Sequence, residues 1–169
     1  MKNKGLRLTL LLLITSGWFI LMRKMTAALD PGSILKFEFI GTAEKAVKFL
    51  NDLKTAGHIE LITLSIYLDF IFPLLYGAMF FYASAWACGK LPEGHSLNRF
   101  RILSGMTVIA VACDMLENIS LLQLIYHNPA DRYAKAAFFF AGTKFLLLTI
   151  VLLHFLASLG FARNRKQKE

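Results

Sequence analysis

The sequence predicts an all-α integral membrane protein, in which four membrane-spanning helices form a bundle and a further short amphipathic helix lies in the first loop. Of the 169 residues, 56% are hydrophobic and 18% are charged, whereas about a quarter are charged in a typical soluble domain. The charged residues also collect in short stretches between long apolar runs. A lipid bilayer selects this pattern, because charged side chains are costly in its hydrocarbon core.

Four apolar runs are long enough to span a membrane, since roughly 20 helical residues cross a hydrocarbon core of about 30 Å. Each run must be helical, because an unpaired backbone polar group in lipid costs several kcal/mol. Together they predict a single transmembrane domain over residues 1–169. The expected spans cover about residues 6–22, 61–87, 102–126 and 136–161.

The first run has a basic start and an apolar core, which is also the pattern of a secretory signal peptide. Against a signal peptide, Arg23 and Lys24 follow the core directly, and Thr26 and Ala28 form only a poor cleavage pair. We therefore expect an uncleaved anchor.

The first loop contains signals for a short amphipathic helix over about residues 42–55. Thr42 can cap its N-terminus, and Glu44 lies in the first turn, where the helix dipole favours an anion. Gly57 provides a stop signal. The apolar side of this helix is formed by Ala46, Val47, Leu50 and Leu53. We expect it to lie on the outer membrane surface or over the end of the bundle.

The basic residues favour an orientation with both termini in the cytoplasm. The two terminal segments and the second connection together contain slightly more basic residues than the first and third loops do. Residues 163–168 are also strongly basic, and basic residues favour the cytoplasmic side. The net charge of +8 does not predict a nucleic-acid partner, because no basic stripe is interleaved with exposed aromatic residues. Attraction to the anionic headgroups of membrane lipids explains this charge.

No metal or other cofactor is expected from the cysteines and histidines. Cys88 and Cys113 fall at different depths in the membrane, so they predict neither a disulfide nor a metal site. The four histidines lie at different heights, and no two of them are spaced to ligate a metal.

The strongly polar residues within the spans all fall in the half of the bilayer that faces the first loop. At a rise of about 1.5 Å per residue, Asp114 lies at the midplane and Glu117 about 6 Å towards that loop. Asp69 lies about 7 Å and Lys144 about 4–5 Å from the midplane of its own span in the same direction. Because charged groups in a bilayer must face the bundle interior and find partners, we expect Lys144 to pair with Asp114 or Glu117.

The polar residues also share helix faces. Asp114, Glu117 and Asn118 are spaced i, i+3 and i+4 in the third span. Pro73 lacks an N–H, so the second span can bend beside Asp69. The sequence therefore predicts one interior site, covered by the 42–55 helix. Its expected members are Ser65, Asp69, Tyr76, Asp114, Glu117, Asn118 and Lys144.

Three functions remain open for this site. It could bind a membrane lipid, another small amphiphile or a proton-coupled solute, because ionisable groups within membranes are functional by default. It could instead only fix helix packing, in a homo-oligomer or in a structural or accessory subunit of a larger membrane complex. A membrane enzyme that uses the carboxylates is the third alternative. It is the least favoured, because the chain has no Ser–His pair, phosphate-binding glycine loop or repeated aspartate motif.

Three segments carry a resemblance to a known group of proteins. They are FEFIGTAEKAVKFLNDL in the first loop, DFIFPLLYG in the second span and DMLENISLL in the third span. Together they resemble a group of small bacterial multi-pass membrane proteins without an assigned activity. This resemblance implies a four-span protein of the bacterial cytoplasmic (inner) membrane, and it implies no particular reaction or ligand.

Overall fold

The computed structural model describes residues 2–92, 94–127 and 129–166, and every regular element in these ranges is a helix. The all-α fold class is thereby confirmed. The helices are α1 (Lys2–Met25), α2 (Ser33–Glu38), α3 (Ala43–Thr55), α4 (Ile59–Asp69), α5 (Phe72–Cys88), α6 (Phe100–Tyr126) and α7 (Asp131–Lys166).

Four helical segments are long and apolar enough to cross a membrane, which indicates a multi-pass membrane protein. They are Gly5–Met25, Ile59–Cys88, Phe100–Tyr126 and Asp131–Asn164. Each contains one of the four expected spans and extends beyond it by a few residues at one or both ends.

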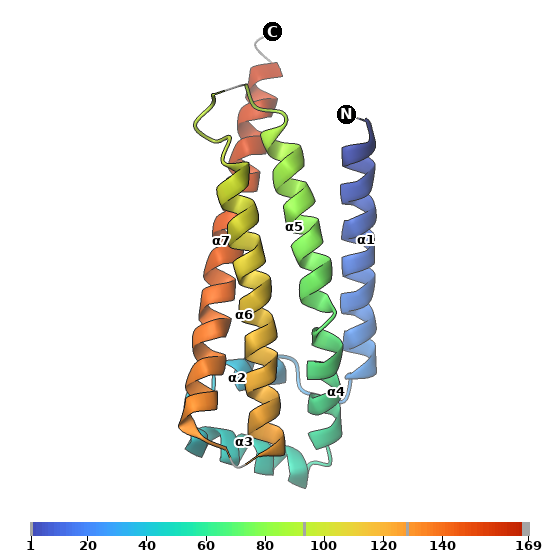
Figure 1. Ribbon diagram of the computed structural model, residues 1–169. Coiled ribbons are helices and arrows are strands. Elements are labelled where there is room, and N and C mark those ends of the chain that lie inside the picture. The colour runs from blue at the N-terminus through green and yellow to red at the C-terminus, as the bar shows by residue number, and fades with distance from the viewer. Residues whose placement is uncertain (1, 93, 128, 167–169) are drawn as a thin grey trace.

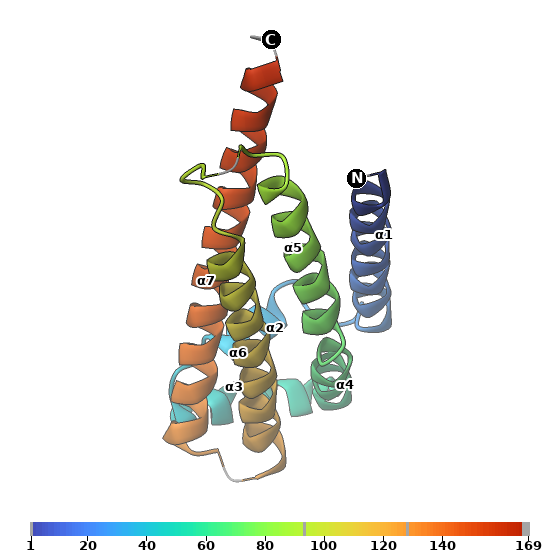
Figure 2. The same ribbon diagram turned by 45° about the horizontal axis from the view of Figure 1, so that its top comes forward.

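The bundle consists of α4 and α5 in line, α6 and α7, with α1 packed against α5 and α4 (Figure 1). Both views show α1 standing on the far side of α5 from α6 (Figure 2). The N- and C-termini lie at one end of the bundle, and α2 and α3 lie at the other. We call the half that contains α2 and α3 the loop-side half, and the other the terminus-side half.

The second span is broken between α4 and α5, at Phe70 and Ile71. This break lies where the missing N–H of Pro73 predicts a bend, because Pro73 cannot donate to the carbonyl four residues earlier. The indole Nε1 of Trp18 in α1 donates to the carbonyl oxygen of Leu68 at 3.3 Å. A side chain from a neighbouring helix thus reaches a backbone acceptor beside the break, which also accepts from the N–H of Ile71.

The amphipathic helix in the first loop is confirmed as α3. The hydroxyl of Thr42 accepts from the backbone N–H of Lys45, and Gly41 before it has a φ of 72°. At the same end, the carboxylate of Asp131 accepts from the backbone N–H of Ala43 at 2.7 Å. An anion from the start of α7 therefore satisfies a free donor at the start of α3.

Helices α5 and α6 approach each other closely at Gly77. A Cβ atom added there would lie 2.6 Å from Cγ2 of Val111, which is far inside van der Waals contact. Small residues permit this kind of approach between helices in membranes.

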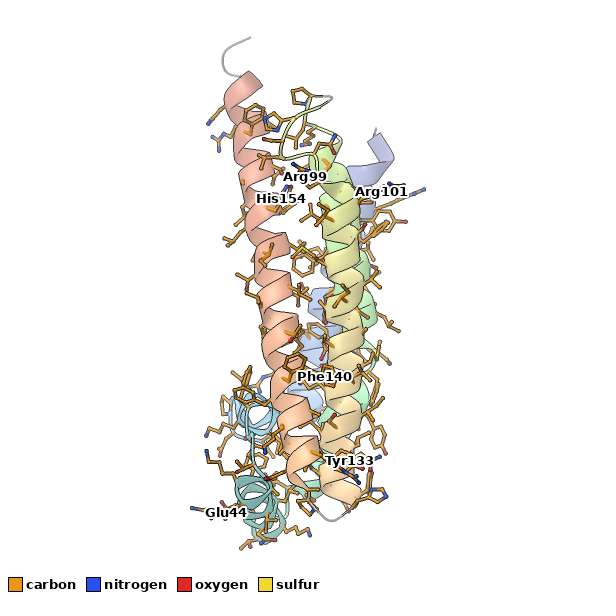
Figure 3. All side chains as sticks on the ribbon, turned by 60° about the vertical axis from the view of Figure 1, so that its left-hand side comes forward. Glu44, Arg99, Arg101, Tyr133, Phe140 and His154 are labelled. Carbon is orange, nitrogen blue, oxygen red and sulfur yellow. The ribbon has the colours of Figure 1, made fainter. Side chains whose placement is uncertain are left out.

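Two apolar clusters of buried residues occupy opposite halves of the bundle. The loop-side cluster joins α2 and α3 to the ends of α4, α6 and α7, and includes Phe37, Leu50, Ile66 and Leu121. The terminus-side cluster contains Cys88, Leu103 and Val151. Figure 3 shows Arg99 and Arg101 near the terminus-side end of the bundle and Glu44 at the opposite end.

Candidate functional site

Lys144 of α7 lies at the centre of a group of buried ions. Its ammonium Nζ donates to Oδ1 of Asp114 at 2.7 Å and to Oε1 of Glu117 at 3.0 Å, and lies 2.8 Å from Oε2 of Glu117. It also lies 3.6 Å from Oε1 of Glu38. Each of these four side chains is at most 8% exposed. The expected pairing therefore forms, and Lys144 pairs with both carboxylates of α6.

Two further hydrogen bonds attach the second span to this group. Tyr76 of α5 donates its hydroxyl to Oδ2 of Asp114 at 2.7 Å. Asn118 of α6 donates its amide to Oδ2 of Asp69 at 2.9 Å. The close approach at Gly77 holds α5 against α6 one residue after Tyr76. Helices α4, α5, α6 and α7 thus meet through polar side chains at one level.

We call these seven residues the polar cluster: Glu38, Asp69, Tyr76, Asp114, Glu117, Asn118 and Lys144. Six of them were predicted from the sequence. The seventh predicted member, Ser65, is buried one helical turn from Asp69 and lines the adjacent cavity.

Glu38 was not predicted as a member of the site. It belongs to α2, a short helix that was not predicted from the sequence. The residues on either side of Glu38 hold that helix in place. Phe37 stacks on Phe49 of α3 with ring centroids 5.1 Å apart. Phe39 contacts two rings of α7, those of Phe138 and Phe145. The available signal was a carboxylate between two phenylalanines in the stretch ILKFEFI, which is apolar apart from Lys36 and Glu38.

The site was expected to be covered by the 42–55 helix, but Glu38 shows that α2 is the element of the first loop that reaches it. The element that reaches the polar cluster is α2, through Glu38, whereas the apolar side of α3 packs into the loop-side apolar cluster. Burial raises the pKa of the Glu38 carboxyl above its ordinary value, although the ammonium of Lys144 acts in the opposite direction. The first loop thus contributes a charged group as well as a cover.

A cavity of about 620 Å³ opens beside the polar cluster. Its walls come from α1, α2, the second span and α7, and its lining is mostly apolar. Glu38, Asp69, Tyr76, Asp114 and Lys144 provide its polar end, and Arg23 and Asp30 are further charged residues of its lining. The apolar walls include Phe19, Met22, Phe72, Phe80, Phe145 and Leu148. The cavity is therefore amphipathic, with charge at one end and hydrocarbon along its sides.

Two buried polar atoms of residues that line the cavity have no hydrogen-bond partner in the described part of the chain. They are Oε2 of Glu38 and the hydroxyl Oγ1 of Thr15 in α1. Leaving a buried polar atom without a partner typically costs about 1–3 kcal/mol. Such atoms beside a cavity can bind a polar group that enters it.

Among the described residues, no group of three or more His, Cys, Asp and Glu side chains is arranged to hold a metal ion. Cys88 and Cys113 are free and buried. A comparison of the chain with protein-family models, with curated proteins and with solved structures finds no match.

Proposed function

We propose that this protein binds a lipid or another small amphiphile in the cavity between α1, α2 and α7. The observation that carries the proposal is the cavity itself, which combines apolar walls with an end of buried charged groups. Ligand pockets typically have this composition, in which apolar walls supply contact area and a few polar groups fix the orientation.

The network alone would also be compatible with a purely structural role, because polar side chains hold membrane helices together. Two observations favour binding over that role. The network borders a cavity instead of a closed core, and Glu38 and Thr15 keep polar atoms without partners beside it. A role as an accessory subunit or an enzyme has no comparable supporting observation in the described residues.

Native mass spectrometry of gently extracted protein tests the proposal. We expect the parent to retain a bound amphiphile, and Leu148→Trp to lose it, because Leu148 lines the cavity and the larger side chain fills it. Leu146→Trp is the matched control, since Leu146 lies on the same helix and is 62% exposed on the outer surface of the bundle.

If the protein is recovered without a bound amphiphile from membranes of several lipid compositions, this would contradict binding and favour a structural role. A co-purified protein in place of an amphiphile would favour an accessory subunit, and self-association would favour a homo-oligomer.

We also propose that the protein lies in the bacterial inner membrane with both termini in the cytoplasm. The two termini share one end of the bundle, and the basic residues at that end support a cytoplasmic location. Single cysteines at Lys2, Arg163 and Lys45, in a variant that lacks Cys88 and Cys113, test this. An impermeant reagent added outside the cells should label only the cysteine at Lys45. Labelling of the two terminal cysteines from outside would reverse the orientation.

A further inference from the structure

The polar end of the cavity has more hydrogen-bond acceptors than donors, and more negative than positive groups. The lining of the cavity contains four acidic side chains, those of Asp30, Glu38, Asp69 and Asp114, and two basic ones, those of Arg23 and Lys144. Lys144 directs its donors at Asp114 and Glu117, at 2.7 and 3.0 Å. Its charge is therefore already matched, and it is poorly placed to hold an anionic ligand.

Glu38 is the carboxyl that remains least satisfied. Its nearer oxygen lies 3.6 Å from Lys144, beyond ordinary hydrogen-bond length, and Oε2 has no partner in the described part of the chain. Its side chain is only 8% exposed, so bulk water does not replace the missing partner. Glu38 lines the cavity, and a donor that enters the cavity can therefore reach it.

Thr15 provides an independent observation from another helix. Threonine hydroxyls in a helix usually donate to the carbonyl one turn earlier, and several in this chain do so. Examples are Thr9, Thr26, Thr63, Thr107 and Thr143. Thr15 is 7% exposed and lines the cavity, yet its hydroxyl has no such partner in the described residues. Its oxygen is a second free acceptor on the α1 side.

We infer that the ligand is an amphiphilic amine, whose protonated N–H-bearing head group binds between Glu38 and Thr15 while its apolar body lies along the aromatic walls. An ammonium supplies the donors that Oε2 of Glu38 and Oγ1 of Thr15 lack, and its charge offsets the excess of carboxyls. This inference rests on the proposed function, because it specifies the ligand class of the same cavity.

The test uses the full chain in phosphatidylcholine nanodiscs and four probes with the same alkyl chain: decylammonium, decyltrimethylammonium, decanol and decanoate. Binding is measured as the excess over that of Leu148→Trp, which subtracts partition into lipid. We expect decylammonium to bind at least tenfold more tightly than each of the other three.

Two isosteric variants locate the head group. Glu38→Gln should weaken decylammonium binding roughly tenfold, because a charge-assisted hydrogen bond is lost. Thr15→Val should weaken it roughly threefold, because a neutral hydrogen bond is lost. Glu60→Gln is the control, since Glu60 is an exposed carboxylate at the start of α4 that does not line the cavity. Its binding should equal that of the parent.

Equal or tighter binding of decanoate or decanol would overturn the amine assignment and leave amphiphile binding intact. Equal binding of decyltrimethylammonium would overturn the requirement for N–H donors. If no probe binds the parent better than Leu148→Trp, the proposed function fails together with this inference. An unchanged affinity in both Glu38→Gln and Thr15→Val would overturn the location.

Discussion

The two halves of the bundle are built from the same kinds of helix but are held together differently. In the terminus-side half, buried apolar residues such as Cys88, Leu103 and Val151 pack against one another. In the loop-side half, four helices meet through the ion pairs and hydrogen bonds of the polar cluster, and α2 adds Glu38 from the first loop. A cavity of about 620 Å³ borders the polar cluster.

The two kinds of contact differ in how much stability is lost when one partner is removed. Apolar contacts between helices add modestly to stability in lipid, because lipid tails are as apolar as the side chains that they would replace. A buried ion pair is different, because each ion without its partner is strongly unfavourable in a medium of low dielectric constant. We therefore expect loss of the cation of the polar cluster to have a larger effect than apolar substitutions at the other end.

The largest effect is expected for Lys144→Met. It removes the only cation of the polar cluster and leaves Asp114, Glu117 and Glu38 without it. Removing one partner of a buried pair typically costs about 3–5 kcal/mol. The melting temperature in mild detergent should fall strongly at pH 8, and less at pH 5, where the Glu38 carboxyl, whose pKa is raised by burial, is protonated to a greater extent.

Two further variants sharpen this prediction. Lys144→Met combined with Glu117→Gln should recover part of the loss, because one abandoned carboxylate is then absent. Lys135→Met is the control, since the Lys135 side chain is 69% exposed and pairs only at 3.8 Å with Asp131; a pair of this kind contributes about 0–1 kcal/mol. If Lys144→Met melts like the parent at both pH values, Lys144 does not bind the carboxylates.

A smaller loss is expected for Gly77→Ala, which should force α5 away from α6. The added Cβ would lie 2.6 Å from Cγ2 of Val111, and overpacking of this kind typically costs about 1–3 kcal/mol. Adding Val111→Ala should restore most of the stability by removing the clashing methyl group. Gly142→Ala is the control, because a Cβ there meets no atom within 4 Å. Equal stability of the two glycine variants would show that α5 and α6 are farther apart.

Val151→Ala probes the terminus-side half, where Val151 is fully buried. It removes packing without exposing a charge, so we expect a loss of roughly 1 kcal/mol, measured under the same unfolding conditions as Lys144→Met. A loss as large as that of Lys144→Met would remove the contrast between the two halves.

The smallest effect is expected for Glu38→Gln, and its sign depends on pH. Burial raises the pKa of Glu38 above its ordinary value of about 4.5, so the folded protein holds this proton more tightly than the unfolded chain does. The contribution of Glu38 to stability is therefore full below pH 4.5 and decreases as pH rises through the raised pKa. Glutamine cannot ionise, so the stability of Glu38→Gln relative to the parent should increase from pH 5 to pH 8. The opposite trend would mean that Lys144 stabilises the ionised form more than burial disfavours it.

Much of the fold follows directly from the sequence. Four apolar runs of sufficient length give four spans, Pro73 marks the break in the second, and Thr42 and Gly57 delimit α3. Most of the polar cluster could also be predicted, because polar residues in lipid must pair with one another. Depth along each helix shows which of them can meet. This argument works for Asp114, Glu117 and Lys144, whose contacts are direct.

Glu38 and the cavity could not be predicted by the same argument. Depth along a span has no meaning for a residue in a loop, so the sequence does not show that α2 folds back against α7. The contacts of Phe37 and Phe39 with distant rings determine this position. The cavity depends on where α1 lies, and an apolar helix without a polar stripe carries little information about its neighbours. Both missing features are tertiary in origin.

The most direct test of a ligand cavity in the loop-side half is a cryo-electron microscopy structure in lipid nanodiscs, with a bound antibody fragment to provide mass. Our account predicts elongated density between α1 and α7, with one end within hydrogen-bond distance of Glu38 and Thr15, and none in Leu148→Trp. A structure in which α1 packs against α7 and the polar cluster is closed from the bilayer would contradict it.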